Sequence, residues 1–538
     1  MFGESVMKRF IERLRKSLPI IVLVLLGVTM WRTCNYTGKR TLEIRDHKWD
    51  KLLLVLDQIE KHYVDSIDYK DIIEKTLPAI MENLDPHSVY LPPQELVDAE
   101  ESLEGNFSGI GIQFNVPNDT VVVINVIPGG PSERAGLLSG DRIITVDGIN
   151  IAGVEMPQDS IVKRLKGPRG SQVKIEVMRD NLAELVPFTI TRDRIPVNSI
   201  DVAFMINDTT GYVKLSKFSR TSYIEFMAAA AMFKENGAKT IIFDLRDNSG
   251  GYLDQALLLS NEFLAKQQLI VYMEGLHRKR EEFFADGRGS LQDVGLYVLI
   301  NESSASSSEI FAGAIQDNDR GTIVGRRSFG KGLVQEPIYF TDKSGIRLTV
   351  ARFYTPTGRS IQKPYSENYK YDILERYNHG EMIVADSIKR NDSLKFVTPG
   401  GKTVYGGGGI IPDIFVPLDT VGVTNFLVNV NRKSLVVKYS IKLSDIYRPQ
   451  LRKVQNFEDL EKLISTIDFG SGFLAFAKAN GVVPKGNEWK RSEEFIVTQL
   501  KGLFGRYTVL DDKAYYPYVL KIDNVVQTIL EQQSGKTE

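Results

Sequence analysis

The chain has 538 residues, too many for one ordinary hydrophobic core, and indicates roughly three or four domains. A hydrophobic content of 42% and a charged content of 25% exclude a largely disordered chain. The net charge of -1 provides no overall field that would attract nucleic acid. One cysteine, Cys34, excludes a disulfide framework, and the five scattered histidines include no pair at i, i+4 spacing. We therefore expect no nucleic-acid partner and no metal site.

The N-terminal stretch has the pattern of an export signal. Five basic residues precede an apolar run, residues 18–31, which is short for a full membrane span but fits a signal anchor or a cleaved signal peptide. The basic excess before the run favours an N-terminus inside the cytoplasm. No A-x-A-like cleavage site follows, and Trp31-Arg32 fits a lipoprotein site poorly. The sequence predicts a cytoplasmic tail and uncleaved anchor in residues 1–42; a cleaved signal and a buried core strand are the alternatives.

Residues 43–103 carry helical patterns. Apolar residues recur at helical spacing between positions 52 and 63, and a second helix over about 71–84 stops at Asp85-Pro86. A third helix begins near Pro92 and is acidic. No residue pattern here carries obvious chemistry. We expect a helical N-terminal arm that packs against the rest of the protein or forms a dimer contact.

Residues 104–196 change to short strands and turns, with one helix over 158–165. The expected strands are 108–114, 121–126, 141–146, 173–178 and 188–191. The order of motifs resembles a PDZ domain. Gly109, Ile110, Gly111 and Ile112 would then form the loop that binds a peptide carboxylate, and the peptide would add as a strand to the sheet edge. On its own, the Gly-Ile-Gly-Ile sequence also fits a strand with a glycine bulge.

Residues 197–424 alternate between strands and helices, which predicts an α/β core with a largely parallel sheet. Ligands of such sheets lie at the carboxyl ends of the strands. Two polar segments fall at such ends: Asn248-Ser-Gly-Gly251 and a cluster of five serines within 303–308. Residues 354–420 are rich in turns, and residues 425–538 return to amphipathic helical patterns, which predicts a helical C-terminal region.

The serine cluster allows two interpretations. The simpler one is a capping box, because Ser306 and Glu309 have the S-x-x-E spacing at the start of a helix. The other is catalysis, in which Ser306 is a nucleophile and Lys331 a general base, with burial lowering the pKa of the lysine. Gln335 would share a strand face with Lys331, and Asp317 lies about three helical turns after Ser306. A plain surface lysine is the alternative for Lys331.

Longer motifs around these residues resemble one enzyme family, the carboxyl-terminal processing (tail-specific) proteases of the S41 serine peptidases that carry a PDZ domain. The resemblance extends from Leu84-Asp-Pro-His-Ser-Val-Tyr-Leu91 to Gly409-Ile-Ile-Pro-Asp413. It includes Ser-Ala-Ser-x-Ser-Glu at 304–309, Ser-Phe-Gly-Lys-Gly-x-Val-Gln at 328–335 and Asp-Leu-Arg-Asp-Asn-Ser-Gly-Gly at 244–251. The fold it implies is multidomain α+β, with a crotonase/ClpP-like α/β core, an inserted PDZ domain at 104–196, and helical regions at both ends.

The resemblance also implies roles for individual residues. Ser306 would be the nucleophile, Lys331 the base, Gln335 its orienting partner and Asp317 a supporting acid. Backbone N–H groups would form the oxyanion hole, and these belong to Gly250 or Gly251 and to Ser307. Ser307 and Ser249 depart from the common family pattern, which has Ala at the first position and Pro or Gly at the second. For that reason Ser304 and Ser308 stay open as alternative nucleophiles.

The sequence therefore predicts a serine endopeptidase that binds protein C-terminal tails through its PDZ domain and cleaves exported proteins. We expect it on the periplasmic side of a bacterial inner membrane, anchored by residues 18–31, without a cofactor. Expected partners are proteins or peptides with apolar C-termini, the membrane, and a second copy or an adaptor protein. A PDZ scaffold without catalysis and a crotonase-like acyl-transfer enzyme are the alternative functions.

Overall fold

The structure is a computed structural model that describes residues 50–179, 184–366 and 368–535. The described residues divide into two compact units, one within residues 1–96 and 335–349 and one within residues 97–334 and 350–538. The anchor predicted at residues 18–31 lies outside the described residues. Within the described ranges, no helix combines the length and the apolar character that a membrane span requires.

The first unit is built from helices and parts of three strands. Its elements are α2 (Asp50–His62), α3 (Tyr69–Glu82), β1 (Val89–Leu91), the start of α4 (Pro93–Glu104), and parts of β17 (Leu333–Tyr339) and β18 (Gly345–Tyr354). The side chain of Asp68 caps the N-terminus of α3, which ends before Asp85-Pro86 as predicted. β1 pairs antiparallel with β18, with Val89 opposite Arg347.

The PDZ-like part of the second unit centres on a sheet in the order β3-β4-β5-β7-β8, with β6 paired to β5. The elements are β3 (Ile112–Asn115), β4 (Val121–Val126), α5 (Pro131–Ala135), β5 (Arg142–Val146), β6 (Ile149–Asn150), α6 (Gln158–Leu165), β7 (Gln172–Met178) and β8 (Val186–Thr191). The prediction of one strand over 108–114 is wrong. The strand is interrupted at Gly111, where φ is +77°, so that β2 (Asn106–Gly109) is separate from β3. β2 pairs with β9 (Asp193–Pro196) instead.

The largely parallel sheet predicted for the core is confirmed. Its order is β10-β11-β12-β15-β16-β21, and only the β10–β11 pairing is antiparallel. The strands are β10 (Ile200–Asn207), β11 (Thr210–Leu215), β12 (Thr240–Asp244), β15 (Gly295–Ile300), β16 (Thr322–Gly325) and β21 (Ile414–Phe415).

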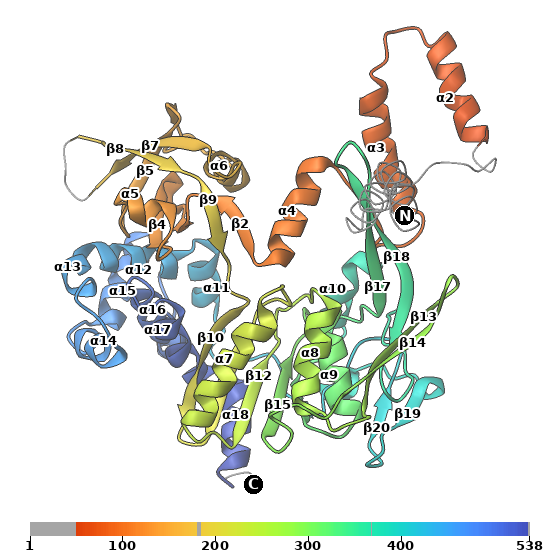
Figure 1. Ribbon diagram of the computed structural model, residues 1–538. Coiled ribbons are helices and arrows are strands. Elements are labelled where there is room, and N and C mark those ends of the chain that lie inside the picture. The colour runs from red at the N-terminus through yellow and green to blue at the C-terminus, as the bar shows by residue number, and fades with distance from the viewer. Residues whose placement is uncertain (1–49, 180–183, 367, 536–538) are drawn as a thin grey trace, which may run out of the picture. The chain divides into compact units, whose positions relative to one another are not determined.

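Helices cover both faces of this sheet. On one face pack α7 (Ser222–Glu235), α8 (Leu253–Phe263) and α9 (Ser307–Asp317), which are labelled together in Figure 1. Their aromatic side chains form the centre of the core, where Phe243 of β12 stacks on Phe311 of α9 with 4.8 Å between ring centroids. On the other face packs α18 (Asn524–Gln533), through Val525, Val526 and Ile529.

Sequence reasoning missed part of the core. The hairpin of β13 (Leu269–Gly275) and β14 (Arg278–Phe284) was not predicted, because β14 begins with five charged residues and has no alternation of buried and exposed side chains. The region predicted as surface turns also contains regular elements: α10 (Asp372–Asn378), β19 (Lys395–Val397) and β20 (Thr403–Tyr405).

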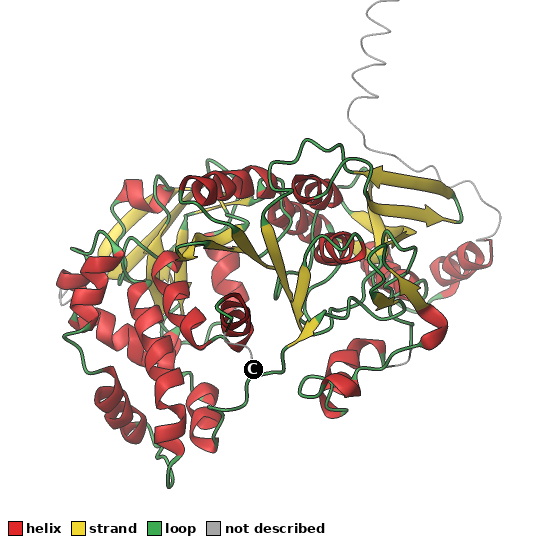
Figure 2. Cartoon of the chain, turned by 90° about the horizontal axis from the view of Figure 1, so that it is seen from below, coloured by secondary structure: helices red, strands yellow, loops and turns green. Residues whose placement is uncertain are grey.

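The C-terminal region consists of helices (Figure 2), and all of them except the last share a hydrophobic core of their own. They are α11 (Asn425–Arg432), α12 (Leu435–Ile446), α13 (Arg448–Leu451), α14 (Phe457–Ile464), α15 (Phe469–Ala479), α16 (Glu488–Gly505), α17 (Asp512–Val519) and α18. This region contacts the PDZ-like part through an ion pair between Arg142 and Asp445, at 2.5 Å. The side chain of Asn125 on β4 also donates a hydrogen bond to Asp511, at 3.1 Å.

Candidate active site

Ser306 lies in a strained backbone conformation between β15 and α9. Its φ is 57° and its ψ is -113°, in a region that residues with a side chain rarely adopt. Strain of this kind costs about 1–3 kcal/mol and persists only where surrounding contacts enforce it, as they do at many active sites. The residue immediately precedes the first turn of α9, where free N–H groups and the helix dipole favour a developing negative charge. A half-buried hydroxyl at such a position suits a nucleophile.

Three neighbouring serines have a different role. The hydroxyl of Ser304 donates to the carbonyl of Leu245 at 2.7 Å, and that of Ser308 donates to the carbonyl of Asn248 at 2.9 Å. Ser307 donates to the carbonyl of Gly251 at 3.0 Å. All three side chains are buried. Their hydroxyls tie the serine cluster to residues 245–251, and a hydroxyl engaged in this way is a poor nucleophile. The geometry therefore favours Ser306 over Ser304 and Ser308.

Residues 248–251, the predicted oxyanion segment, approach Ser306 closely. A Cβ atom built on Gly250 would lie 2.8 Å from the Cβ of Ser306 and 2.8 Å from the carbonyl oxygen of Ala305, so only glycine fits. The N–H of Gly250 donates to the side chain of Asn248 at 2.9 Å, which occupies one of the predicted oxyanion donors. Of the predicted donors, Gly251 and Ser307 have N–H groups that none of the described hydrogen bonds uses.

Glu309 connects the serine cluster to the lysine segment. Its Oε2 accepts hydrogen bonds from the N–H groups of Ser306, at 2.9 Å, and of Lys331, at 2.8 Å. Its Oε1 accepts from the hydroxyl of Ser328, at 2.5 Å, and from the N–H of Gly330, at 2.7 Å. Burial raises the pKa of this fully buried carboxyl, and the four donors oppose that shift. The Glu309 half of the predicted capping box is thus present, and the same carboxylate brings the two predicted catalytic segments together.

A second lysine lies beside the predicted base segment and was missed by sequence reasoning. The N–H of Lys363 donates to the carbonyl of Gly330 at 3.0 Å, and its Nζ lies 3.9 Å from the ring centroid of Phe329. Burial lowers the pKa of Lys363, against the opposing charge of Asp372 at 3.1 Å. The residues before Lys363 predict a surface turn. The hydrogen bond to Gly330 is what places Lys363 beside the predicted base segment.

Asp317 is in a buried ion pair at the C-terminal end of α9. Its Oδ1 lies 2.6 Å from Nη2 of Arg359, and both side chains are fully buried. The hydroxyl of Thr357 donates to its other oxygen at 2.7 Å. These contacts describe a residue that fixes the loop after β18 to α9. Its predicted supporting role in catalysis stays a prediction.

Gln335 belongs to the first unit. Its side-chain amide donates to the carbonyl of His87 at 2.6 Å. The turn that presents this carbonyl is held by Asp85, which accepts hydrogen bonds from the N–H groups of His87 and Ser88, both at 2.8 Å. The predicted partnership of Gln335 with Lys331 stays a prediction.

The predicted peptide-binding residues line a groove in the PDZ-like part. A cavity of about 160 Å³ lies between β3 and α6. Its lining is largely apolar: Phe107, Gly109, Ile110, Gly111, Ile112, Phe114, Val162, Leu165 and Lys166. Because β3 is the edge strand of its sheet, its outer edge is available for an added strand.

Three regions of the chain match models of known families. Residues 209–373 match peptidase family S41, and residues 108–189 match the PDZ domain. Residues 426–509 match a family of unknown function.

Curated relatives that match more than half of the chain agree with the match to the peptidase family. The chain is 34% identical over 336 residues to a carboxy-terminal-processing protease of Bartonella bacilliformis, covering 59% of this chain and 76% of that protein. It is 30% identical over 347 residues to the carboxy-terminal processing protease CtpA of Bacillus subtilis, covering 64% of this chain and 73% of that protein. It is 35% identical over 301 residues to a carboxyl-terminal-processing protease of Synechocystis, covering 54% of this chain and 69% of that protein.

Proposed function

Because this chain belongs to peptidase family S41, as a serine-type carboxy-terminal-processing protease with a PDZ domain, we propose that Ser306 and Lys331 are its nucleophile and general base. One observation carries the proposal. The strained Ser306 and the backbone of Lys331 are held by the same oxygen of one buried carboxylate, that of Glu309. Two segments that are distant in the sequence are thereby fixed within one site.

The proposed reaction is acyl transfer to Ser306 followed by hydrolysis. A neutral Lys331 Nζ accepts the hydroxyl proton as Ser306 Oγ attacks the carbonyl carbon of the scissile peptide bond. The negative charge that develops on the carbonyl oxygen is stabilised by N–H groups of Gly251 and Ser307. The lysine then gives its proton to the leaving amine, and the C–N bond breaks. Water hydrolyses the acyl-enzyme by the same proton transfers, with Gln335 orienting the lysine.

We place substrate capture in the PDZ groove. The C-terminal tail of a protein would pair with the free edge of β3, and the loop at residues 109–112 would bind its carboxylate. The apolar lining of the groove suits an apolar terminal side chain. The export pattern at the N-terminus supports substrates among exported proteins and attachment to the inner membrane by residues 18–31.

The test compares single alanine variants on a protein substrate with an apolar C-terminus. Ser306→Ala and Lys331→Ala should each abolish turnover and leave binding of a tail peptide unchanged. Ser303→Ala is the matched control, since this exposed serine belongs to the same cluster and should retain turnover. Turnover that persists in Ser306→Ala would show that another residue is the nucleophile. Absence of turnover in the unaltered protein would favour a PDZ scaffold without catalysis.

A further inference from the structure

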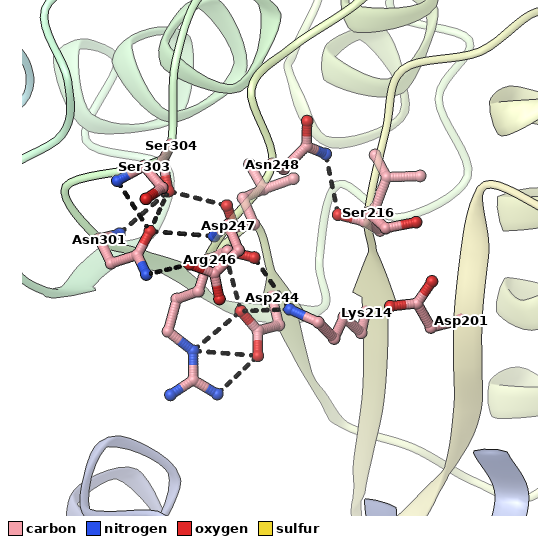
Figure 3. Close-up of polar contacts among 12 residues, drawn as sticks. Asp201, Lys214, Ser216, Asp244, Arg246, Asp247, Asn248, Asn301, Ser303 and Ser304 are labelled. Atoms are coloured by element: carbon pink, nitrogen blue, oxygen red, sulfur yellow. Dashed lines mark hydrogen bonds and ion pairs between the residues drawn. The ribbon is translucent and has the colours of Figure 1, made fainter. Parts of the chain in front are cut away.

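A buried ionic network lies at the end of β12, directly before the oxyanion segment (Figure 3). Asp244 is fully buried. Its carboxylate accepts hydrogen bonds from Nη2 of Arg246 at 2.6 Å and from the hydroxyl of Tyr212 at 2.7 Å. Burial alone would raise the pKa of Asp244, but Arg246 and Lys214 hold it well below its ordinary value. The carboxylate is therefore charged, and it fixes one side of the Arg246 guanidinium.

The backbone between this network and the oxyanion segment is held at successive residues. The Nζ of Lys214 donates to the carbonyl of Arg246 at 2.9 Å. Asp247 has a φ of +63° and exchanges two hydrogen bonds with the side chain of Asn301, at 2.9 and 2.8 Å. Asn248 donates to the carbonyl of Leu215 at 2.8 Å. Residues 246–248 are consecutive, so a displacement of the Arg246 backbone would act on residues 248–251 through the chain itself, against these contacts.

The other side of Arg246 is held from the far end of the chain. Its Nη1 donates to Oδ1 of Asp523 at 3.0 Å, and its Nη2 lies 2.8 Å from Oδ2 of the same carboxylate. This is the two-pronged geometry in which arginine binds a carboxylate most strongly. Asp523 also caps the N-terminus of α18, accepting hydrogen bonds from the N–H groups of Val525 and Val526 at 3.0 and 3.1 Å.

Asp523 lies outside the three regions that match known families. Its position is nevertheless well defined, because α18 buries Val525, Val526 and Ile529 against the core sheet. Seven residues before Asp523, Tyr516 donates a hydrogen bond to Asp201 of β10 at 3.1 Å. The last helices are thus attached to the same sheet that carries the active-site loops.

We propose that Asp523 is a positioning residue of the peptidase site, which fixes the oxyanion segment through Arg246. This inference rests on the proposed function, because it requires the oxyanion segment to stabilise charge during acylation of Ser306. Without the Asp523 carboxylate, Arg246 keeps only its partners on the Asp244 side, and the backbone that leads to Gly251 loses its outer support. Transition-state stabilisation falls, whereas capture of the tail by the PDZ groove does not.

The decisive variant is Asp523→Asn in the full chain. Asparagine is as good an N-cap as aspartate, so α18 keeps its cap while the charge that pairs with Arg246 is lost. The matched control is Asp468→Asn, the same substitution at the N-cap of α15, where Asp468 accepts a hydrogen bond from Ser471 at 3.0 Å. Asp523→Ser provides a second variant with a good cap and no charge.

We expect Asp523→Asn to lower kcat about 10- to 100-fold with KM unchanged, as a displaced oxyanion donor does. The affinity for a peptide boronate, which mimics the tetrahedral state, should fall by a similar factor, while the affinity for a C-terminal tail peptide stays constant. Hydrogen exchange of residues 246–252 should accelerate. If Asp523 only stabilised the fold, its loss would instead change kcat, both affinities and hydrogen exchange together, because less of the protein would be folded. The thermal unfolding midpoint of each variant measures that contribution.

Wild-type kcat and boronate affinity in both Asp523 variants would overturn the inference, as would a uniform loss in which tail affinity falls together with kcat. Failure of the proposed function gives a different result. In that case a fluorophosphonate probe would label the unaltered protein at a residue other than Ser306, or would not label it.

Discussion

Glu309→Gln tests whether one carboxylate holds the two catalytic segments together. All four of its partners are donors, and three of them are backbone N–H groups that cannot reverse. A glutamine amide must replace one accepting oxygen by an NH₂ group. Placed at the Oε2 position, that group leaves two backbone N–H donors, those of Ser306 and Lys331, without an acceptor. Placed at the Oε1 position, it leaves only the N–H of Gly330 without an acceptor, because the hydroxyl of Ser328 can rotate and accept a hydrogen bond from the amide.

These two orientations differ in cost. A buried donor left without a partner costs about 1–3 kcal/mol, so the first orientation costs about 2–6 kcal/mol and the second about half of that. We therefore expect the amide NH₂ to face Ser328, with a loss of about 1–3 kcal/mol in the free energy of unfolding. The oxygen that joins Ser306 to Lys331 survives in this orientation. Acylation should consequently slow by less than about tenfold, which corresponds to 1.4 kcal/mol.

Glu309→Ala provides the contrast, because it removes both oxygens and releases both segments. We expect acylation by a fluorophosphonate probe to fall by more than about 100-fold, the effect of misplaced reacting groups. Chemical denaturation and probe-labelling rates measure the two quantities on each variant. Acylation at the wild-type rate in Glu309→Ala would refute the tether, and equal losses in the glutamine and alanine variants would refute the assignment of roles to the two oxygens.

Three further substitutions have defined outcomes. Gly250→Ala places a Cβ atom 2.8 Å from that of Ser306 and should reduce probe labelling at least about 100-fold, and wild-type labelling would contradict the close approach. Arg359→Met leaves the buried Asp317 carboxylate without its ion partner and should cost about 3–5 kcal/mol in denaturation experiments, most of which the additional change Asp317→Leu should restore. The pKa of Asp244 is lowered by folding, so its contribution to stability is present above the ordinary pKa of about 3.9 and is lost as pH falls toward the folded value. Asp244→Asn should therefore lower the free energy of unfolding at pH 7 and make it less dependent on pH in the acid range. If the free energies of unfolding of the variant and the unaltered protein fell in parallel with pH, this expectation would be wrong.

The sequence by itself predicted many of the local elements and the residues of the candidate site. Helical spacing located α6, α7 and α8, and alternation of strands and helices predicted the parallel sheet. The motifs around Ser306 and Lys331 identified the family, because short motifs depend on which residues stand beside one another in the chain.

The tertiary structure decided which residues meet. Three serines near Ser306 are chemically equivalent to it in the sequence, and their hydrogen bonds to a loop more than fifty residues upstream distinguish them from it. The carboxylate of Glu309 reads as a helix cap until the folded chain brings Gly330 and Lys331 to it. No periodicity links Asp523 to Arg246. That ion pair exists because α18 buries its apolar face against the sheet, and this burial fixes the distance between charges that are remote along the chain.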